Sequence, residues 1–374
     1  MTQTSYLPPK KTPSEKFVRE IKRLGRQIYF KFMPYWGHVT RMICDLQRSR
    51  KVHVIEGQQV ATQDVVVLLV YQPKGILAST YWQLDWLAKQ GLSVVLVSNT
   101  KISDADKAKL SPLTRLIVER PNIGYDFGGY REGVLQVLDR KMAPRNLYVM
   151  NDSMWFPLSE DSDVIDQSRA APEDVWGLFV DLDWRHRKAG NHHRTHVQSY
   201  FFRFSQKVVQ DPRFDRYWRK MSIVNDKRLV IKMRELKLAN HFADLGFSVG
   251  GLHSWAEVRD FLINLDDEEM MDAILRLQCS VKRHDARIIQ PLLERGDMTA
   301  LQIRDALSDK IEATNLFVFS TALHPYVMRS LGFPFLKKQR VAEMIGARAK
   351  ILELGLEAEF PPAIRDEVAV WDKN

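Results

Sequence analysis

Two short polar segments carry the residue types that could do chemistry. The first, RPNIGYDFGGYREG at residues 120–133, places the carboxylate of Asp126 among glycines. The second, NDSMWFPL, begins with Asn151, Asp152 and Ser153. A carboxylate beside an amide and a hydroxyl can hold a divalent cation and the phosphates that the cation bridges, because hard cations take oxygen ligands. An Asx turn at the end of a strand is the simpler interpretation of the same three residues.

The glycines of the first segment have both a functional and a structural interpretation. Gly124, Gly128 and Gly129 allow backbone conformations and close ligand approach that a residue with a Cβ resists. Asp126 stands just before a predicted helix, where its carboxylate could cap free N–H groups, so a glycine-rich turn with a structural cap explains the segment equally well. The spacing is not GxGxxG and a P-loop lysine is missing, which disfavours a Rossmann dehydrogenase or a P-loop NTPase.

Glu235 is a third candidate, in a predicted helix whose apolar positions include Ile231, Leu238 and Phe242. A carboxylate at the rim of such a helix could act as a general base. Most helical glutamates are simply solvated, so the helix alone does not distinguish the two interpretations.

A group of histidines, His186, His192, His193 and His196, lies in a very polar stretch. Its spacing matches no zinc pattern, and no cysteine or HExxH motif accompanies it. We expect a solvated cationic loop, which could hold an anionic group beside the site.

The two polar segments follow strand-like apolar runs, Leu116 to Val118 and Leu147 to Met150, with a predicted helix from Tyr130 to Leu138 between them. Strand, loop, helix, strand and loop is the order of a βαβ unit. Ligands of open α/β sheets bind beyond the carboxyl ends of the strands. Both polar segments are therefore expected to open onto one crevice.

The same alternation extends over the middle of the chain. Apolar runs at 65–71 and 92–97 flank a helical stretch at 78–90, and HVQSYFFRFS from His196 to Ser205 has strand-like alternation. We predict an α/β domain with a mostly parallel central sheet over residues 61–253, a basic amphipathic arm over 1–60, and a mostly helical region over 254–374.

The positive charge of the chain is concentrated in that arm. The 374 residues hold 55 Lys and Arg against 46 Asp and Glu, and Lys10 to Lys51 alone holds 12 basic and 3 acidic residues. A basic helix followed by aromatic residues could lie on an anionic membrane surface; a helix packed on the main domain is the alternative. Since the rest of the chain is nearly neutral and no known nucleic-acid-binding motif occurs, nucleic acid is not an expected partner.

Membrane insertion and secretion are not expected. No run approaches the roughly 18 apolar residues of a membrane span, and the N-terminal residues lack the apolar core of a secretory signal. The two cysteines, Cys44 and Cys279, have no metal-ligand or disulfide pattern. A cytoplasmic protein is predicted, with peripheral contact to the inner face of the cytoplasmic membrane.

Taken in order, the motifs resemble the rhamnan synthesis F family of bacterial cell-surface polysaccharide glycosyltransferases. The resemblance rests on RPNIGYDFGGYREG, NDSMWFPL, HVQSYFFRFS, ELKLANHFADLGF and the closing GFPFLKK. It covers residues 64–253 and then about 315–340. It implies a nucleotide-sugar-binding fold of the GT-A type.

The resemblance also implies an activity and partners. The expected reaction is transfer of a deoxysugar, L-rhamnose from dTDP-rhamnose, to a growing O-antigen, capsule or rhamnan, by an inverting rhamnosyltransferase acting on a lipid-linked acceptor. Mg²⁺ or Mn²⁺ is the implied cofactor, although the motif holds one acid where the commoner motif holds two. A non-catalytic scaffold of a polysaccharide assembly complex is the alternative function.

Residue roles follow from the resemblance in the same way. Glu235 matches the base that deprotonates the acceptor hydroxyl, and Asp152 matches the catalytic, metal-holding acid. The implied nucleotide-sugar contacts are Asn122, Gly124, Asp126, Asn151, Asp152, Ser153 and Gln198.

Overall fold

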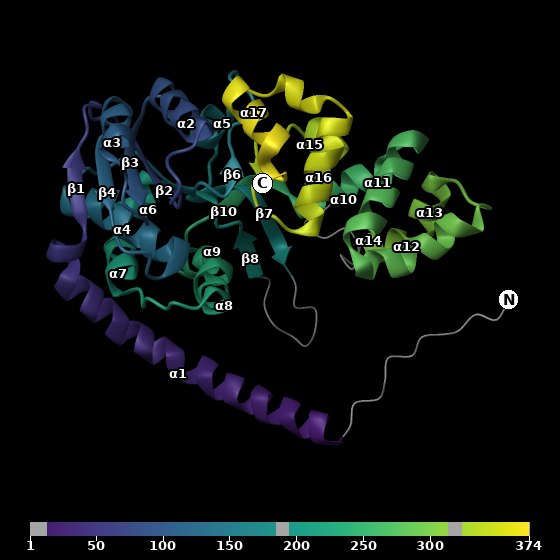
Figure 1. Ribbon diagram of the computed structural model, residues 1–374, viewed down its shortest axis with the longest axis horizontal. Coiled ribbons are helices and arrows are strands. Elements are labelled where there is room, and N and C mark those ends of the chain that lie inside the picture. The colour runs from purple at the N-terminus through teal and green to yellow at the C-terminus, as the bar shows by residue number, and fades with distance from the viewer. Residues whose placement is uncertain (1–12, 185–193, 313–323, 374) are drawn as a thin grey trace.

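The computed structural model describes residues 13–184, 194–312 and 324–373. A twisted sheet forms the centre of the molecule, with a long N-terminal helix along one side and helices of the C-terminal region on the other (Figure 1). The predicted α/β class is confirmed, and so is the parallel arrangement of the central strands.

The large sheet has nine strands in the order β1-β4-β3-β2-β5-β9-β7-β10, with β8 paired to β7. Their bounds are β1 (His53–Glu56), β2 (Asp64–Val70), β3 (Leu92–Ser98), β4 (Leu116–Glu119), β5 (Asn146–Asn151), β7 (Val175–Trp184), β8 (Arg194–Val197), β9 (Phe201–Ser205) and β10 (Val249–Ser254). The block β4-β3-β2-β5 is parallel, β9 runs antiparallel between β5 and β7, and β10 is parallel to β7.

The central strands are covered on both faces, as a parallel sheet requires. Every residue of β2 and β3 is buried. Along β2, Val65, Val67 and Leu69 join one apolar core while the alternate positions join the core on the other face. The continuous apolar run at 65–71 is thus explained by two cores that share one strand.

Helices of the α/β domain lie on the two faces of the sheet. They are α2 (Ala78–Lys89), α3 (Asp104–Leu110), α4 (Tyr125–Asp139), α5 (Val164–Ala170), α6 (Gln206–Val209), α7 (Pro212–Lys220), α8 (Lys227–Val230) and α9 (Leu236–Asp244). Helix α4 packs closely on the sheet because it carries glycines. A Cβ at Gly129 would lie 2.4 Å from a methyl carbon of Leu69, and one at Gly133 would lie 2.2 Å from a methyl carbon of Val67.

Two expected elements are divided. The stretch from His196 to Ser205 is not one strand: β8 pairs with the C-terminal half of β7, and β9 pairs with its N-terminal half and with β5. A turn between β8 and β9 allows the chain to pair with both halves of β7. The predicted helix that contains Glu235 is divided into α8 and α9, which are joined by a π-helical turn, Ile231–Glu235.

The N-terminal arm is largely one helix, α1 (Pro13–Lys51), and residues 1–12 of the arm lie outside the described part of the chain. Strand β1 follows and pairs antiparallel with β4, so the sheet begins within the range expected for the arm. Within the described ranges, no helix combines the length and apolar character that crossing a bilayer requires.

The C-terminal region has two parts. Helices α10 (Trp255–Asn264), α11 (Glu268–Val281), α12 (Arg283–Arg295), α13 (Ala300–Ala306) and α14 (Ser308–Glu312) form one group, and α15 (Pro325–Leu331), α16 (Ala342–Glu353) and α17 (Pro362–Trp371) form the other (Figure 1).

The second group returns to the α/β domain. Strand β11 (Leu336–Lys337) pairs with β6 (Met154–Trp155), directly after the polar segment NDS. On α17, Glu367 accepts hydrogen bonds from the backbone N–H and the hydroxyl of Ser79 at 2.8 and 2.6 Å. Segments 180 residues or more apart in sequence are therefore joined beside the carboxyl ends of the central strands.

Candidate functional site

The carboxyl ends of β2 and β5 are joined by Asp152. Its Oδ2 accepts hydrogen bonds of 3.0 Å from the backbone N–H of Tyr71 and from Nε2 of Gln72, both just beyond β2. Desolvation raises the pKa of Asp152, and the nearby Lys338 ammonium opposes that rise. Asn151 Oδ1 accepts the backbone N–H of Ser153 at 3.1 Å, so the Asx turn is present as well.

Asp126 approaches this cluster from the first turn of α4. The helix begins at Tyr125, after the N-cap residue Gly124 with φ +85°, so Asp126 lies within the first turn and not ahead of the helix as the cap interpretation assumed. Desolvation raises the pKa of the Asp126 carboxyl and the neighbouring Asp152 raises it further, while Lys337 and a hydrogen bond with Asn151 oppose the shift. The two polar segments therefore meet, as the βαβ order predicted.

Glu235 lies at the end of the π-helical turn Ile231–Glu235 and is half-buried. π-turns widen a helix locally and are frequent at functional sites. Burial raises the pKa of Glu235, and a hydrogen bond with Ser199 and the nearby Lys337 charge oppose the rise. Asp126 also influences the pKa of Glu235, which places the two carboxylates in one cluster.

A buried lysine from the C-terminal region completes the cluster. Lys337 on β11 is 4% exposed, and its Nζ donates a hydrogen bond of 2.9 Å to Ser153 Oγ and lies 3.9 Å from the centre of the Tyr200 ring. Burial lowers the pKa of Lys337 to about 7, although Glu235 and Asp126 act to raise it.

Lys338 supplies a second buried cation next to the first. Its Nζ lies 3.3 Å from Ser79 Oγ and 5.3 Å from the centre of a Trp155 ring. Burial lowers the pKa of Lys338, and the Asp152 carboxylate opposes that effect. The closing motif GFPFLKK, in which the two lysines directly follow an apolar run, was the available sequence signal for both, but sequence reasoning gave them no role.

The cluster thus combines carboxylates and ammonium groups at one edge of the sheet. Among the described residues, no group of three or more His, Cys, Asp or Glu side chains is arranged to hold a metal ion. Mg²⁺ is usually bound by one or two carboxylates together with substrate phosphates. Asp152 and Asp126 fit that limited role, and they would hold such a cation only together with a phosphate ligand.

The remaining predicted contact residues lie around this cluster. Gly124 donates its backbone N–H to Asn225 Oδ1 at 3.4 Å, and Asn122 is exposed. Gln198 is half-buried and donates its backbone N–H to the carbonyl of Phe179 at 3.1 Å, and the neighbouring Ser199 forms a hydrogen bond with Glu235.

Of the histidine group, only His196 falls in the described residues. It is buried on β8, and burial lowers its pKa to about 4. His186, His192 and His193 lie outside the described residues, so the cationic loop expected there stays a prediction.

A separate cavity of about 380 Å³ lies between the loop at 158–163 and the helices α15 and α16. Its lining includes Asp161, Arg329 and Glu359 but none of the three clustered carboxylates. The cavity is therefore distinct from the candidate site.

Comparison with known proteins identifies the family. A family model described as Rhamnan synthesis protein F matches residues 94–260. The "Uncharacterized protein y4gN" of Sinorhizobium fredii (strain NBRC 101917 / NGR234) is 37% identical over 368 residues, which are 96% of this chain and 92% of that protein. The chain belongs to the rhamnan synthesis protein F family. The family model spans Asp126, Asp152 and Glu235 and ends before Lys337.

Other similarities of this rhamnan synthesis protein F family member are weaker. "Virulence protein VirA" of Vibrio anguillarum is 28% identical over 173 residues, 45% of this chain and 52% of that protein. Among solved structures, the mannosyltransferase PcManGT from Pyrobaculum calidifontis, in complex with GDP-Man and Mn²⁺, aligns with TM-score 0.35 and 11% identity over 87% of this chain and 97% of that one. The S. aureus TarS 1-349 structure aligns with TM-score 0.30 and 12% identity over 82% and 87% of the two chains.

Proposed function

We propose that this member of the rhamnan synthesis protein F family is a glycosyltransferase that moves a sugar from a nucleotide-sugar donor to a growing cell-surface polysaccharide. The observation that carries the proposal is the cluster of Asp126, Asp152, Glu235, Lys337 and Lys338 at the carboxyl edge of the central strands. Family membership supports a deoxysugar, L-rhamnose from dTDP-rhamnose, as the transferred group.

The donor diphosphate would bind on the cationic side of the cluster. Lys337 and Lys338 are buried, so their charges act in a medium where water screens them little. The N-terminus of α4, a 15-residue helix, adds free N–H groups and the positive end of the helix dipole. Mg²⁺ or Mn²⁺, when bound with the donor, would be held by Asp152 and would neutralise phosphate charge.

The nucleobase would lie at the mouth of the crevice. Tyr71, directly after β2, and Tyr125, at the start of α4, expose their rings to solvent, by 53% and 37%. An exposed aromatic face suits stacking with a planar base. Tyr71 is fixed close to the site, because its backbone N–H binds Asp152.

Glu235 is the proposed general base. As the acceptor oxygen forms a bond to the anomeric carbon, its proton passes to a Glu235 carboxylate oxygen, and the bond from that carbon to the diphosphate oxygen breaks. The departing diphosphate leaves with the electron pair, next to Lys337. A raised pKa makes Glu235 a stronger base than an exposed glutamate. Direct displacement inverts the configuration at the anomeric carbon.

The acceptor in this proposal is a lipid-linked glycan, and the protein acts at the inner face of the cytoplasmic membrane. The basic, aromatic N-terminal arm supports this placement, because such segments are attracted to anionic bilayers.

Calorimetry with dTDP-rhamnose, UDP-glucose and GDP-mannose, each with and without Mn²⁺, tests the proposal. We expect one donor to bind, and we expect Tyr71→Ala to weaken that binding while Tyr35→Ala, a control on α1 that is 71% exposed, does not. Binding of none of the three, together with no sugar transfer, would favour a non-catalytic scaffold.

A further inference from the structure

Helix α1 turns an apolar face away from the rest of the molecule. From this face we infer that α1 binds the surface of an anionic lipid bilayer and holds the candidate site beside it. The inference rests on the proposed membrane location and adds which surface makes the contact and how that surface is placed relative to the site.

The apolar face runs along the C-terminal half of the helix. Its exposed members are Phe32, Tyr35, Trp36, Val39, Met42, Ile43 and Leu46, here called the α1 stripe. Positions 32, 36, 39, 43 and 46 alternate in spacings of four and three, so they follow one side of the helix. Trp36 is 62% exposed and Leu46 is 79% exposed. Contiguous exposed apolar surface of this kind marks an interaction site.

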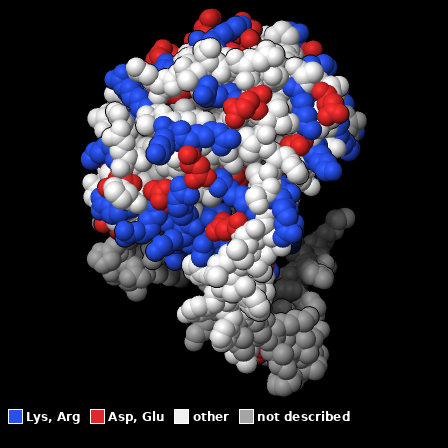
Figure 2. Space-filling view, turned by 90° about the vertical axis from the view of Figure 1, so that its left-hand side faces the viewer, with Lys and Arg blue, Asp and Glu red and all other residues white. Residues whose placement is uncertain are grey.

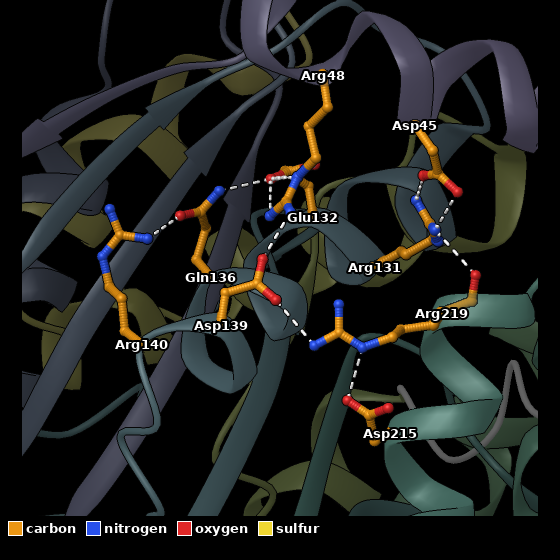
Figure 3. A network of polar contacts seen from close by, with 9 residues as sticks. All are labelled: Asp45, Arg48, Arg131, Glu132, Gln136, Asp139, Arg140, Asp215 and Arg219. Atoms are coloured by element: carbon orange, nitrogen blue, oxygen red, sulfur yellow. Dashed lines mark hydrogen bonds and ion pairs between the residues drawn. The ribbon is translucent and has the colours of Figure 1, made fainter.

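The opposite side of α1 is fixed to the α/β domain. Arg48 forms ion pairs with Glu132 at 2.9 Å and Asp139 at 2.6 Å, and Asp45 pairs with Arg131 at 2.8 Å. Figure 3 shows these side chains of α1 and α4 pointing toward one another, with Arg219 of α7 joining the network through Asp139. Each of these ion pairs joins α1 to α4. Rotating α1 to bring the stripe toward the core would therefore break the ion pairs.

A close backbone contact fixes the middle of the helix in the same orientation. The carbonyl of Gly37 accepts the backbone N–H of Ile223 at 2.9 Å. A Cβ at Gly37 would lie 2.8 Å from a methyl carbon of Val224, so the glycine allows α1 to approach this segment.

The composition of the stripe favours a lipid surface over a second copy of the helix. A coiled-coil seam uses aliphatic residues at two positions of each heptad. The stripe adds Tyr35 and Met42 beside that seam and spans about 120° of the helix circumference at 3.6 residues per turn. Tyr35 and Trp36 have an apolar body and a polar tip, the character of residues enriched at membrane–water interfaces.

Positive charge lies next to the stripe. Figure 2 shows many Lys and Arg side chains gathered on one face of the molecule. The exposed cations include Arg50 and Lys51 of α1 and Arg216 and Lys220 of α7. An apolar face flanked by cations is complementary to an anionic lipid surface, where apolar burial and charge attraction act together.

One short segment, residues 223–227, connects α1 with the candidate site. Ile223 binds Gly37 of α1, and two residues on Asn225 accepts the backbone N–H of Gly124, at the start of α4. Lys227 then lies close enough to Asp126 and Glu235 to influence their pKa values. The segment 223–227 therefore links α1 to the carboxylates. A bilayer bound to α1 would present a lipid-linked acceptor next to this segment.

Vesicle co-sedimentation tests the inference, with the full chain and without donor or acceptor. We expect binding to vesicles of phosphatidylglycerol and phosphatidylcholine, little binding to phosphatidylcholine alone, and weaker binding at high salt. Leu46→Glu should weaken binding at least tenfold, whereas Val60→Glu, outside the helix and 75% exposed against 79% for Leu46, should not.

The contrary outcomes are distinct. Absence of binding to anionic vesicles, or equal loss in Leu46→Glu and Val60→Glu, would overturn the inference. A wild-type dimer in light scattering that Leu46→Glu converts to monomer, with no vesicle binding, would assign the stripe to a second copy instead. Donor binding, measured separately by calorimetry, tests the proposed transferase function and does not depend on vesicles.

Discussion

The ammonium group of Lys337 donates a 2.9 Å hydrogen bond to Ser153 Oγ and so joins residues 184 positions apart in the sequence. Ser153 belongs to the loop after β5, and Lys337 belongs to a two-residue strand of the C-terminal region. Since burial lowers the pKa of Lys337 to about 7, the charge of this site changes within the neutral pH range.

Donor binding is therefore expected to depend on pH. An anionic diphosphate binds the protonated form of Lys337, and above pH 7 the free protein loses that proton. The apparent Kd of the donor should rise as pH increases from 7 to 9, by up to about tenfold per pH unit. Calorimetry across this range measures the slope. Lys337→Met should weaken binding at pH 6 and remove the slope.

Lys337→Arg is the matched control, because arginine keeps its charge at every pH in the range. We expect it to remove the slope while retaining more affinity than Lys337→Met. A wild-type Kd that stays constant between pH 7 and 9 would show that Lys337 does not face the donor phosphates.

Sequence reasoning found the parts of the site that local pattern determines. Asp126 and Asp152 each follow a buried strand of one βαβ unit, so their meeting follows from the topology. Glu235 could be singled out only by resemblance, because a solvated helical glutamate has the same local pattern. Lys337 could not be placed, since its neighbours Asp126, Ser153, Tyr200 and Glu235 come from four segments distant in the chain, and local sequence periodicity does not indicate such contacts.

The fold shows the same division. Strands β2, β3 and β5 were predictable because each is an uninterrupted apolar run buried on both faces. The break between β8 and β9 was not, because its cause is the pairing of both strands with β7 rather than a local turn signal.

Replacement of Glu235 by glutamine should stop chemistry and spare donor binding. A missing general base typically costs about 10²- to 10⁴-fold in rate, so kcat should fall by that factor while the donor Kd changes little. In the wild type, burial raises the pKa of Glu235, and the base works only when deprotonated. The kcat should therefore decline as pH falls through that raised pKa.

Asp244→Asn, an exposed position on the adjoining helix α9, serves as the control and should keep wild-type kcat. Product analysis of the wild type by NMR should show inverted anomeric configuration. Full activity of Glu235→Gln would exclude the residue as the base.

Asp152→Asn separates the charge of Asp152 from its structural role. An asparagine Oδ1 can still accept the N–H groups of Tyr71 and Gln72, which now bind Asp152 Oδ2 at 3.0 Å. Calorimetry should show donor affinity in Mn²⁺ falling at least about tenfold, since a hydrogen bond to a charged group contributes about 1.5–3 kcal/mol. If Mn²⁺ increases the donor affinity of the wild type, that increase should be absent in Asp152→Asn. An increase that persists in the variant would mean that Asp152 does not hold the cation.

Arg48→Met should destabilise the protein through the contact between α1 and α4. Methionine keeps much of the apolar stem but leaves Glu132, whose side chain is 7% exposed, without its 2.9 Å ion pair. Removing one partner of a buried pair costs about 3–5 kcal/mol. Because the Arg48 side chain is 26% exposed, we expect a loss of about 3 kcal/mol, at the lower end of that range. Urea unfolding measures the loss as a lower midpoint at an unchanged m value.

Arg50→Met is the control, because Arg50 is exposed two residues further along α1; it should leave the midpoint unchanged. Equal midpoints for both variants would mean that the ion pairs do not hold α1 against α4.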